Sequence, residues 1–397
     1  MEMKKIKLTI LLLLLSFGSF GQVKFKSEVY SHFGIDNNIF RAPENLQKND
    51  GSFYNPDSLI LSDNFFDLGY DLTLRYKKGR KHKFKFSHDL WTRNYLDSSK
   101  LNQHSIDFDF QYDYKINKDF DMGADYNISK NKKIGTTVLG SELTLPLTYW
   151  RNSMGAYFAT DIIDHNETEV SFDFFNKNYE KSFDGRSLDH KQFSINFTSA
   201  QDLYFAKHDF KAWIDLSWAN RTYETMPALD SLGRSDTTDT RHWHYFTTQL
   251  NFKVYDIGIF SAKVYYRYKT RKDLFQDYFS YTSSMFGTKL YFENKKFELI
   301  LNPQYTVRNY KVKLAPTQAQ QEPLLVYKYF DFSAELNYEI SKGVYLQLIY
   351  EVKNRDTNTE DLSRYTRRPY HSNRILGGIM INPGKLFKKE KIDFGIE

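Results

Sequence analysis

The sequence contains no cysteine, which excludes disulfide bonds, thiolate metal sites, a cysteine nucleophile and lipid attachment through an N-terminal cysteine. After residue 21 it also lacks any apolar run approaching the ~20 residues of a membrane-spanning helix, so a helical inner-membrane protein is excluded. No stretch rich in proline or glycine divides the 397 residues into domains. The 55 Lys and Arg residues are spread along the chain rather than clustered, so nucleic acid is not a predicted partner.

Aromatic residues, by contrast, are abundant. They make up 17% of the chain, yet its mean hydropathy is −0.62. A soluble domain this polar would not ordinarily need so many aromatic side chains, and disordered chains are depleted in them. Outer-membrane β-barrels combine both properties, because apolar residues that face lipid alternate with polar residues that face the lumen. The composition therefore favours this class.

Residues 1–21 have the pattern of a secretory signal peptide. A basic segment precedes the apolar run 8–15, and the small residues Ser19 and Gly21 stand just before Gln22. The alternative is a single N-terminal transmembrane anchor, for which the apolar run is short. We therefore predict an exported chain whose mature part begins at Gln22.

Several segments alternate apolar and polar residues with a period of two. In 106–116, Ile, Phe and Tyr occupy every second position, with Asp, Gln and Lys between them, and 330–340 repeats the pattern with other residues. Strands of soluble β-sandwiches usually have ~5–6 residues, whereas these runs reach the ~9–11 residues of a tilted strand that crosses a bilayer. The pattern predicts transmembrane β-strands.

The connections between these segments alternate between short and long. Short polar turns such as 77–80, 117–119, 293–296 and 341–343 predict tight hairpins at one end of the strands. Short periplasmic turns opposite long external loops are typical of outer-membrane barrels. The longer polar links lie at about 35–63, 95–101, 133–148, 181–189, 226–241, 274–280, 314–326 and 356–370.

We count sixteen strands, with 14 or 18 as alternatives. In hydrocarbon every backbone N–H and C=O needs a protein partner, so strands can span only by closing on themselves. Residues 22–382 are therefore predicted to form a single up-and-down antiparallel β-barrel in the outer membrane, in contact with its lipid. The even strand number places both termini in the periplasm, where the basic tail 383–397 is free to bind a partner.

The polar faces of the strands are assigned to the lumen, and they carry both signs of charge. One interpretation is a wet pore whose separated acidic and basic arcs impose a transverse field on polar permeants. The other is cross-strand charge pairing that stiffens the wall. Lys83, Lys85 and Arg93 are expected to neighbour Asp107, Asp109 and Asp113 on the next strand. Asp331, Glu335 and Glu339 are expected to neighbour Glu351, Lys353 and Arg355 in the same way. The predicted lumen charges are Lys83, Lys85, Arg93, Asp107, Asp109, Asp113, Lys263, Arg267, Lys269, Asp331, Glu335, Glu339, Glu351, Lys353 and Arg355.

Large aromatic residues near the strand ends suit the interfacial girdles of a membrane barrel. The alternative is that they form platforms on which sugar rings stack. The residues concerned are Trp91, Tyr95, Trp150, Trp213, Trp218, Trp243 and Tyr370.

The sequence contains few residue patterns typical of an enzyme active site. No G-x-S-x-G, P-loop, H-E-x-x-H or G-x-G-x-x-G motif occurs. Alternation puts His242 and His244 on one face, but a metal site would need further ligands. The acidic stretch 356–361 offers oxygen ligands for Ca²⁺ but lacks the glycine and the later Glu of an EF-hand loop. A lipase site dispersed over the outer wall stays open, and we predict no enzyme, no metal and no cofactor.

Residues 33–41 lie where the first strand meets its loop and read Phe-Gly-Ile-Asp-Asn-Asn-Ile-Phe-Arg. This segment resembles the beginning of the barrel in a family of outer-membrane β-barrel porins associated with exopolysaccharide export. The matching positions are Gly34, Asp36, Asn38, Phe40 and Arg41, and the segment 370–378 is similar to the family's last strand. The leader and the Tyr-, Lys- and Asn-rich strands also resemble Bacteroidota outer-membrane proteins. The resemblance implies a porin-like barrel with a saccharide permeant. The tail is a departure, since such barrels often end on an aromatic residue.

Two functions from different classes follow. The favoured one is a porin-like channel for small polar solutes or saccharides, with a link to exopolysaccharide export. The alternative is a non-conducting barrel that serves as an accessory subunit of an outer-membrane assembly or secretion complex, suggested by the long loops and the tail.

Overall fold

The computed structural model describes residues 23–43, 46–47, 51–53, 55, 60–139, 142–180, 187–205, 208–315, 322–360 and 369–386. The predicted leader 1–21 and most of the tail 383–397 lie outside these residues.

The first half of the barrel wall consists of β1 (Val23–Asp36), β2 (Asp63–Lys78), β3 (His82–Tyr95), β4 (Gln103–Lys115), β5 (Phe120–Lys132), β8 (Tyr149–Thr160), β9 (Asn166–Tyr179) and β10 (His190–Phe205). The second half consists of β11 (His208–Leu229), β12 (Ser235–Ile257), β13 (Phe260–Asp273), β14 (Tyr281–Glu293), β15 (Phe297–Leu314), β16 (Leu324–Ser341), β17 (Val344–Thr357) and β18 (Tyr370–Ile381). The remaining elements are the hairpin β6 (Ile134–Leu139) and β7 (Glu142–Pro146), the 3-10 turn η1 (Ser99–Leu101) and the short helix α3 (Pro383–Leu386).

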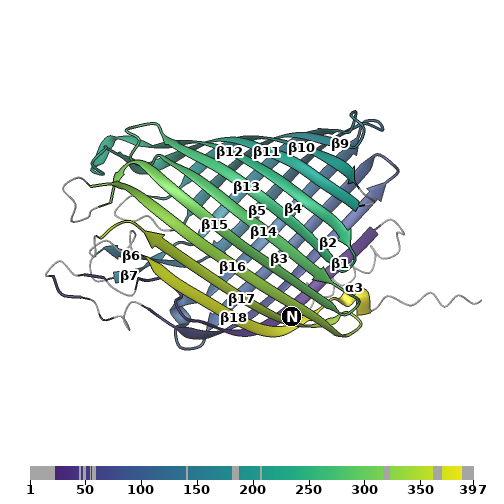
Figure 1. Cartoon of the computed structure of the whole chain (residues 1–397), viewed down its shortest axis with the longest axis horizontal. Coiled ribbons are helices and arrows are strands. Elements are labelled where there is room, and N and C mark those ends of the chain that lie inside the picture. Colours follow the sequence, from purple (N-terminus) through teal and green to yellow (C-terminus); the bar gives the residue numbers. More distant parts are fainter. Residues whose placement is uncertain are drawn as a thin grey trace, which may run out of the picture.

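Sixteen strands form one closed antiparallel barrel, which confirms the predicted fold class and strand number. Each strand pairs with its neighbour in sequence, and β1 pairs with β18 to close the wall, with Asp36 opposite Arg374. The strands are strongly tilted, as closure of a barrel requires (Figure 1). Long connections gather at one end, while the short turns and α3 lie at the other (Figure 1).

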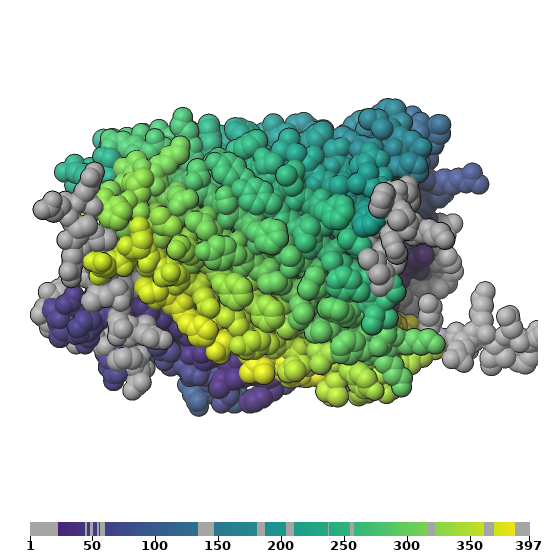
Figure 2. Space-filling model, viewed as in Figure 1, coloured from purple at the N-terminus to yellow at the C-terminus, as the bar shows by residue number. Residues whose placement is uncertain are grey.

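The outer face of the barrel is apolar. Large hydrophobic side chains occupy every second position of the strands and are exposed, for example Phe33 and Ile35 on β1 and Leu346 and Leu348 on β17. Figure 2 shows how the side chains of neighbouring strands close over the backbone into a continuous wall. An exposed apolar surface of this extent is not compatible with water, whereas a closed barrel satisfies its backbone in lipid. The protein is therefore located in the outer membrane.

Two predicted loops are wrong in part, because they contain regular strands. The link 226–241 is mostly a continuation of β11 and β12, which pair beyond the barrel wall with register shifts on either side of Pro227. The link 133–148 holds the hairpin of β6 and β7. Both hairpins satisfy their backbone internally, so polarity alone did not distinguish them from irregular loops. None of the helices in the described part of the chain is long and apolar enough to cross a membrane.

The girdle prediction is correct in orientation for Trp150 and Trp218, which are exposed on the outer face. It is wrong for the other five residues, because their positions share the inner face of their strands. Trp91 lies two residues from the buried Arg93 on β3, and the same alternation turns Trp243 inward on β12. The five inward aromatic residues are Trp91, Tyr95, Trp213, Trp243 and Tyr370.

Candidate functional site in the barrel lumen

An acidic row crosses the inner wall from β1 to β4. In the strand register Glu28 lies opposite Asp71, Asp71 opposite Asp89, and Asp89 opposite Asp107. Like charges directly opposite each other across a strand pair are destabilising. Sequence reasoning found only Asp107 of these four, because the row exists only once the strands are in register.

A lysine row crosses the inner wall from β12 to β14. Lys253 lies opposite Lys263, which in turn lies opposite Lys289. The sequence prediction included Lys263 but missed its two neighbours. Lys263 also lies over the ring of Trp213, with its Nζ 4.5 Å from the ring centroid, so its aliphatic stem has an apolar support.

The acidic row and the lysine row face each other across the lumen. β3 and β13 are eight strands apart in either direction around the barrel of sixteen. Followed around the closed wall, the register brings Lys263 to within about two residues of the depth of Asp89. Opposite charges therefore stand on facing walls at nearly the same level.

The lumen is hollow at this level. Asp89 on one wall and Arg267 on the other are exposed although both occupy inward positions of a closed barrel. An inward side chain can meet solvent only from the interior. These walls therefore border an aqueous space, which a barrel of ~16 strands is wide enough to hold.

The structure brings some predicted charges together and separates others. Lys83 lies opposite Asp113, and the Nζ of Lys85 is 3.6 Å from a carboxylate oxygen of Asp109. On the other side of the barrel, Asp331 lies opposite Lys353. The prediction is wrong for Glu335 and Glu339, which lie lower on β16, opposite Ile349 and Tyr345. Glu351 and Arg355 flank Lys353 on β17, and Arg267 and Lys269 follow Lys263 on β13.

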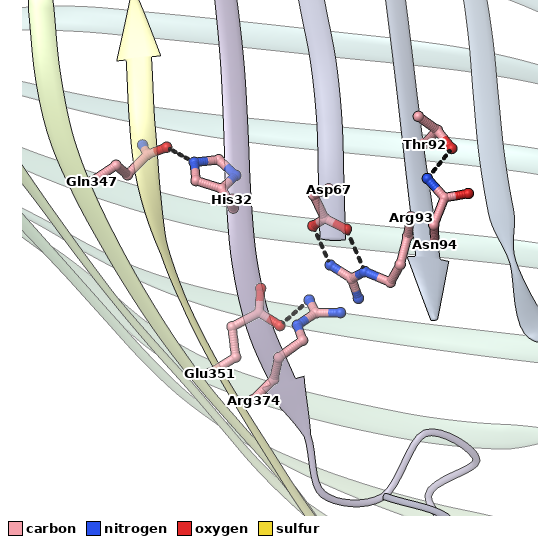
Figure 3. A network of polar contacts seen from close by, with 8 residues as sticks. All are labelled: His32, Asp67, Thr92, Arg93, Asn94, Gln347, Glu351 and Arg374. Atoms are coloured by element: carbon pink, nitrogen blue, oxygen red, sulfur yellow. Dashed lines mark hydrogen bonds and ion pairs between the residues drawn. The ribbon is translucent and has the colours of Figure 1, made fainter. Parts of the chain in front are cut away.

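The prediction that Arg93 neighbours the aspartates of β4 is wrong. Arg93 lies opposite Gln103 on β4 and forms a bidentate ion pair with Asp67 on β2, with N···O distances of 2.8 and 2.6 Å (Figure 3). Both side chains are almost fully buried. The guanidinium also stacks on Phe65, 3.9 Å from the ring centroid. This pair belongs to the packed part of the lumen rather than to its charged rows.

Asn38 of the family-like motif anchors the start of the long connection between β1 and β2. It is 2% exposed, and its amide exchanges hydrogen bonds with the backbone of Ala42 at 2.7 and 2.8 Å. Its Nδ2 also donates to the carbonyl of His371 on β18 at 2.9 Å. The carboxylate of Asp36 accepts the backbone N–H of Asn38 at 3.1 Å. The motif therefore fixes a turn against the seam of the barrel.

This turn folds into the lumen. Ile39 and Phe40 pack against Phe65 and Leu376, which occupy inward positions of β2 and β18. Gly34 makes room for this cluster, because a Cβ there would lie 2.7 Å from the ring of Phe65 and 2.5 Å from a backbone oxygen of β18. The connection thus narrows the lumen at the end where the long loops gather.

Arg41 lies between two cavities beside this turn and has a positive φ of 52°. One cavity, of about 230 Å³, is lined by charged residues that include Arg93, Lys133, Glu351 and Arg374. The other, of about 390 Å³, extends along β15 to β18 and shares Arg41, Glu351 and Lys353 with the first. Arg374 and Glu351 form an ion pair across β17 and β18 (Figure 3). Desolvation of the Lys133 ammonium beside this cavity and the positive charge of Arg41 lower the pKa of the lysine.

The candidate metal sites are not supported by the geometry. His242 and His244 share the outer face of β12, and His242 is hydrogen-bonded to Asn220 at 2.5 Å. No group of three or more His, Asp or Glu suited to a metal ion occurs in the part of the chain that the structure describes. The acidic stretch 356–361 lies partly outside that part.

Comparison with known proteins returns structures but no sequence family. No family model matches the chain, and no curated protein sequence matches it. Similar solved structures include Acinetobacter baumannii OccAB1, with a TM-score of 0.46 and 8% identity over 91% of this chain and 97% of that one. Pseudomonas putida OprB has a TM-score of 0.44 and 8% identity over 91% and 94%. Pseudomonas aeruginosa OccK2 (OpdF) has a TM-score of 0.41 and 9% identity over 90% of this chain and 98% of that one. The fold assignment itself rests on the strand pairing described above.

Proposed function

We propose that this barrel is a porin-like channel that carries small polar solutes across the outer membrane. The observation behind the proposal is the acidic row that faces the lysine row across an aqueous lumen. A wall that only needed stiffening would alternate the signs of opposite residues, because that arrangement is favourable. Rows of one sign lose this favourable pairing of opposite charges, and they create an electric field across the pore.

Such a field acts on whatever passes between the rows. Cations are drawn along the acidic row and anions along the lysine row, while a dipolar solute is oriented across the lumen. The inward-folded turn around Arg41 reduces the cross-section above the rows, so solutes would enter through a narrowed, charged opening. This arrangement suits small hydrophilic solutes.

A saccharide permeant, and a link to exopolysaccharide export, are finer parts of this proposal. They rest on the family-like residues 33–41 and on the aromatic residues that line the inner wall. The motif residues anchor the turn that narrows the lumen, so they influence the largest solute that can pass.

Single-channel recording tests the proposed function. The refolded chain without its predicted leader is added to a planar bilayer, and its insertion is verified by the faster electrophoretic migration of the unheated barrel. Stable open steps are expected, and Asp71→Asn with Asp89→Asn should make the channel less selective for cations. A correctly folded barrel that stays silent would refute the channel and favour the accessory-subunit alternative.

A further inference from the structure

A second group of lumen residues lies above the charged rows, towards the end with the long connections. It consists of six cationic side chains on the inner face of β8, β9, β11, β13 and β15, and we call it the cationic band. Its members are Arg151, Lys177, Arg221, Lys269, Arg271 and Arg308.

Members of the band lie close together in the strand register, and Arg221 is offset by two residues from the registers of Lys177 and Arg271. Arg151 lies directly opposite Lys177, and Lys269 and Arg308 both lie opposite Ser283. None of the six residues has an ion pair with a carboxylate within the described residues. The hydrogen bonds of Arg221 and Arg271 go to neutral acceptors, the side chain of Gln192 and the carbonyl of Phe279. Asp173 and Asp273 interact electrostatically with Arg151 and Arg271, but neither carboxylate is within ion-pair distance of a band residue. The cations of the band therefore have no direct carboxylate partner among the described residues.

Aromatic rings hold the cations in place. Arg271 on β13 and Arg308 on β15 both lie over the ring of Tyr281 on β14, at 4.5 and 4.6 Å from its centroid. Arg221 and Lys269 share the ring of Tyr245 at 5.2 and 4.8 Å. Stacking on a ring orders a guanidinium without consuming its N–H donors, which are arranged as a fork that fits carboxylate and phosphate groups.

Two donors of this region also lack an acceptor. Arg308 Nε and the indole Nε1 of Trp243 are buried and have no hydrogen-bond partner among the residues that the structure describes. The Trp243 ring lies under Arg271, with 4.4 Å between the guanidinium carbon and the ring centroid. A buried donor without a partner carries a free-energy penalty. The band therefore offers ordered cations without ion-pair partners, next to donors without acceptors. A bound oxyanion would neutralise these cations and accept hydrogen bonds from these donors.

We propose that the cationic band binds solutes that carry a carboxylate or phosphate group and draws them into the pore. The inference rests on the proposed channel function, since it names the chemical class that the channel prefers. The acidic row ends at Asp107 on β4, two strands away from Arg151 at one end of the band. The lysine row lies below the other end of the band, on β12 to β14, so an anion bound at Arg271 and Arg308 would leave along the lysine row.

The test uses three matched solutes in the single-channel assay. Glucuronate supplies a carboxylate, glucose 6-phosphate supplies a phosphate, and glucose supplies the ring alone. Transient blockage of the current is expected with one or both anions but not with glucose, and the active anion identifies which oxyanion the band accepts. Arg271→Gln with Arg308→Gln should weaken the blockage by about tenfold, because charge-assisted hydrogen bonds are lost.

A matched double variant separates local binding from general electrostatics. Lys263→Gln with Lys289→Gln removes the same charge from the deeper lysine row and should weaken the blockage by less than threefold. Equal effects of the two double variants, or no blockage of the wild-type channel by either anion, would overturn the proposal. If the wild-type barrel is silent, calorimetric titration of the detergent-solubilised barrel with the same solutes still decides whether the band binds anions, so failure of the channel and failure of the band remain distinguishable.

Discussion

Reversal of the charge on Lys263 is the most direct test of the facing rows. Lys263 is the middle residue of the lysine row, with Lys253 and Lys289 on its two sides. Lys263→Glu should make the channel more selective for cations, because the substitution places a negative charge on the wall that faces Asp89.

The size of the effect follows from Coulomb's law. A unit charge about 10 Å from a permeating ion contributes roughly 0.4 kcal/mol at the dielectric constant of water. Reversal from a positive to a negative charge doubles this interaction energy. Screening over the Debye length of about 10 Å at 0.1 M salt reduces it to roughly 0.3 kcal/mol for each ion. Cations gain and anions lose this amount, so the permeability ratio should change by about threefold at 0.1 M salt and by about sevenfold at 0.01 M.

The assay is the reversal potential of the open channel under a salt gradient, measured at both ionic strengths. Lys272→Glu is the matched control, because Lys272 lies on the same strand but on its outer face and should leave selectivity unchanged. Stable open steps with the wild-type reversal potential in the Lys263 variant would show that this side chain does not border the permeation path, and the facing rows would lose their proposed role.

Three further outcomes are expected. Arg93→Met should lower the free energy of unfolding by about 3–5 kcal/mol in urea titrations, because it leaves the buried Asp67 carboxylate without its partner. Gly378→Ala should reduce the folded fraction on unheated gels, since a Cβ there would collide with the backbone oxygen of Ser31 across the closing strand pair. Asn38→Ala should raise the single-channel conductance or make it fluctuate, because the narrowing turn loses its anchor to Ala42 and β18.

Each of these has a control within the chain. Combining Arg93→Met with Asp67→Leu should restore most of the lost stability, and a double variant as unstable as the single one would show that packing rather than the unpaired charge dominates. Gly377→Ala should be tolerated, because the nearest atoms would lie 3.8 Å from its Cβ. Asn294→Ala, in a short turn at the opposite end, should leave conductance unchanged, and an equal effect of both asparagine variants would argue against an anchored turn.

Alternation in the sequence determined the architecture. A period of two assigns each residue of a strand to one of two faces, and runs longer than a soluble strand leave a bilayer as the environment. Closure then follows from the need to satisfy the backbone in lipid. The same alternation predicts that Trp91 points inward, because Arg93, two residues later on the same strand, is assigned to the lumen.

The tertiary structure alone decided which charges stand side by side. The acidic row joins Glu28 to Asp107 through two other strands, and the lysine row joins Lys253 to Lys289, so each depends on registers that a single strand does not encode. The narrowing turn depends on the closing pair of β1 and β18, whose residues are more than 300 positions apart in the sequence. Periodicity specifies the face that a side chain occupies, whereas its neighbours across the wall and across the lumen are set by how the strands align when the barrel closes.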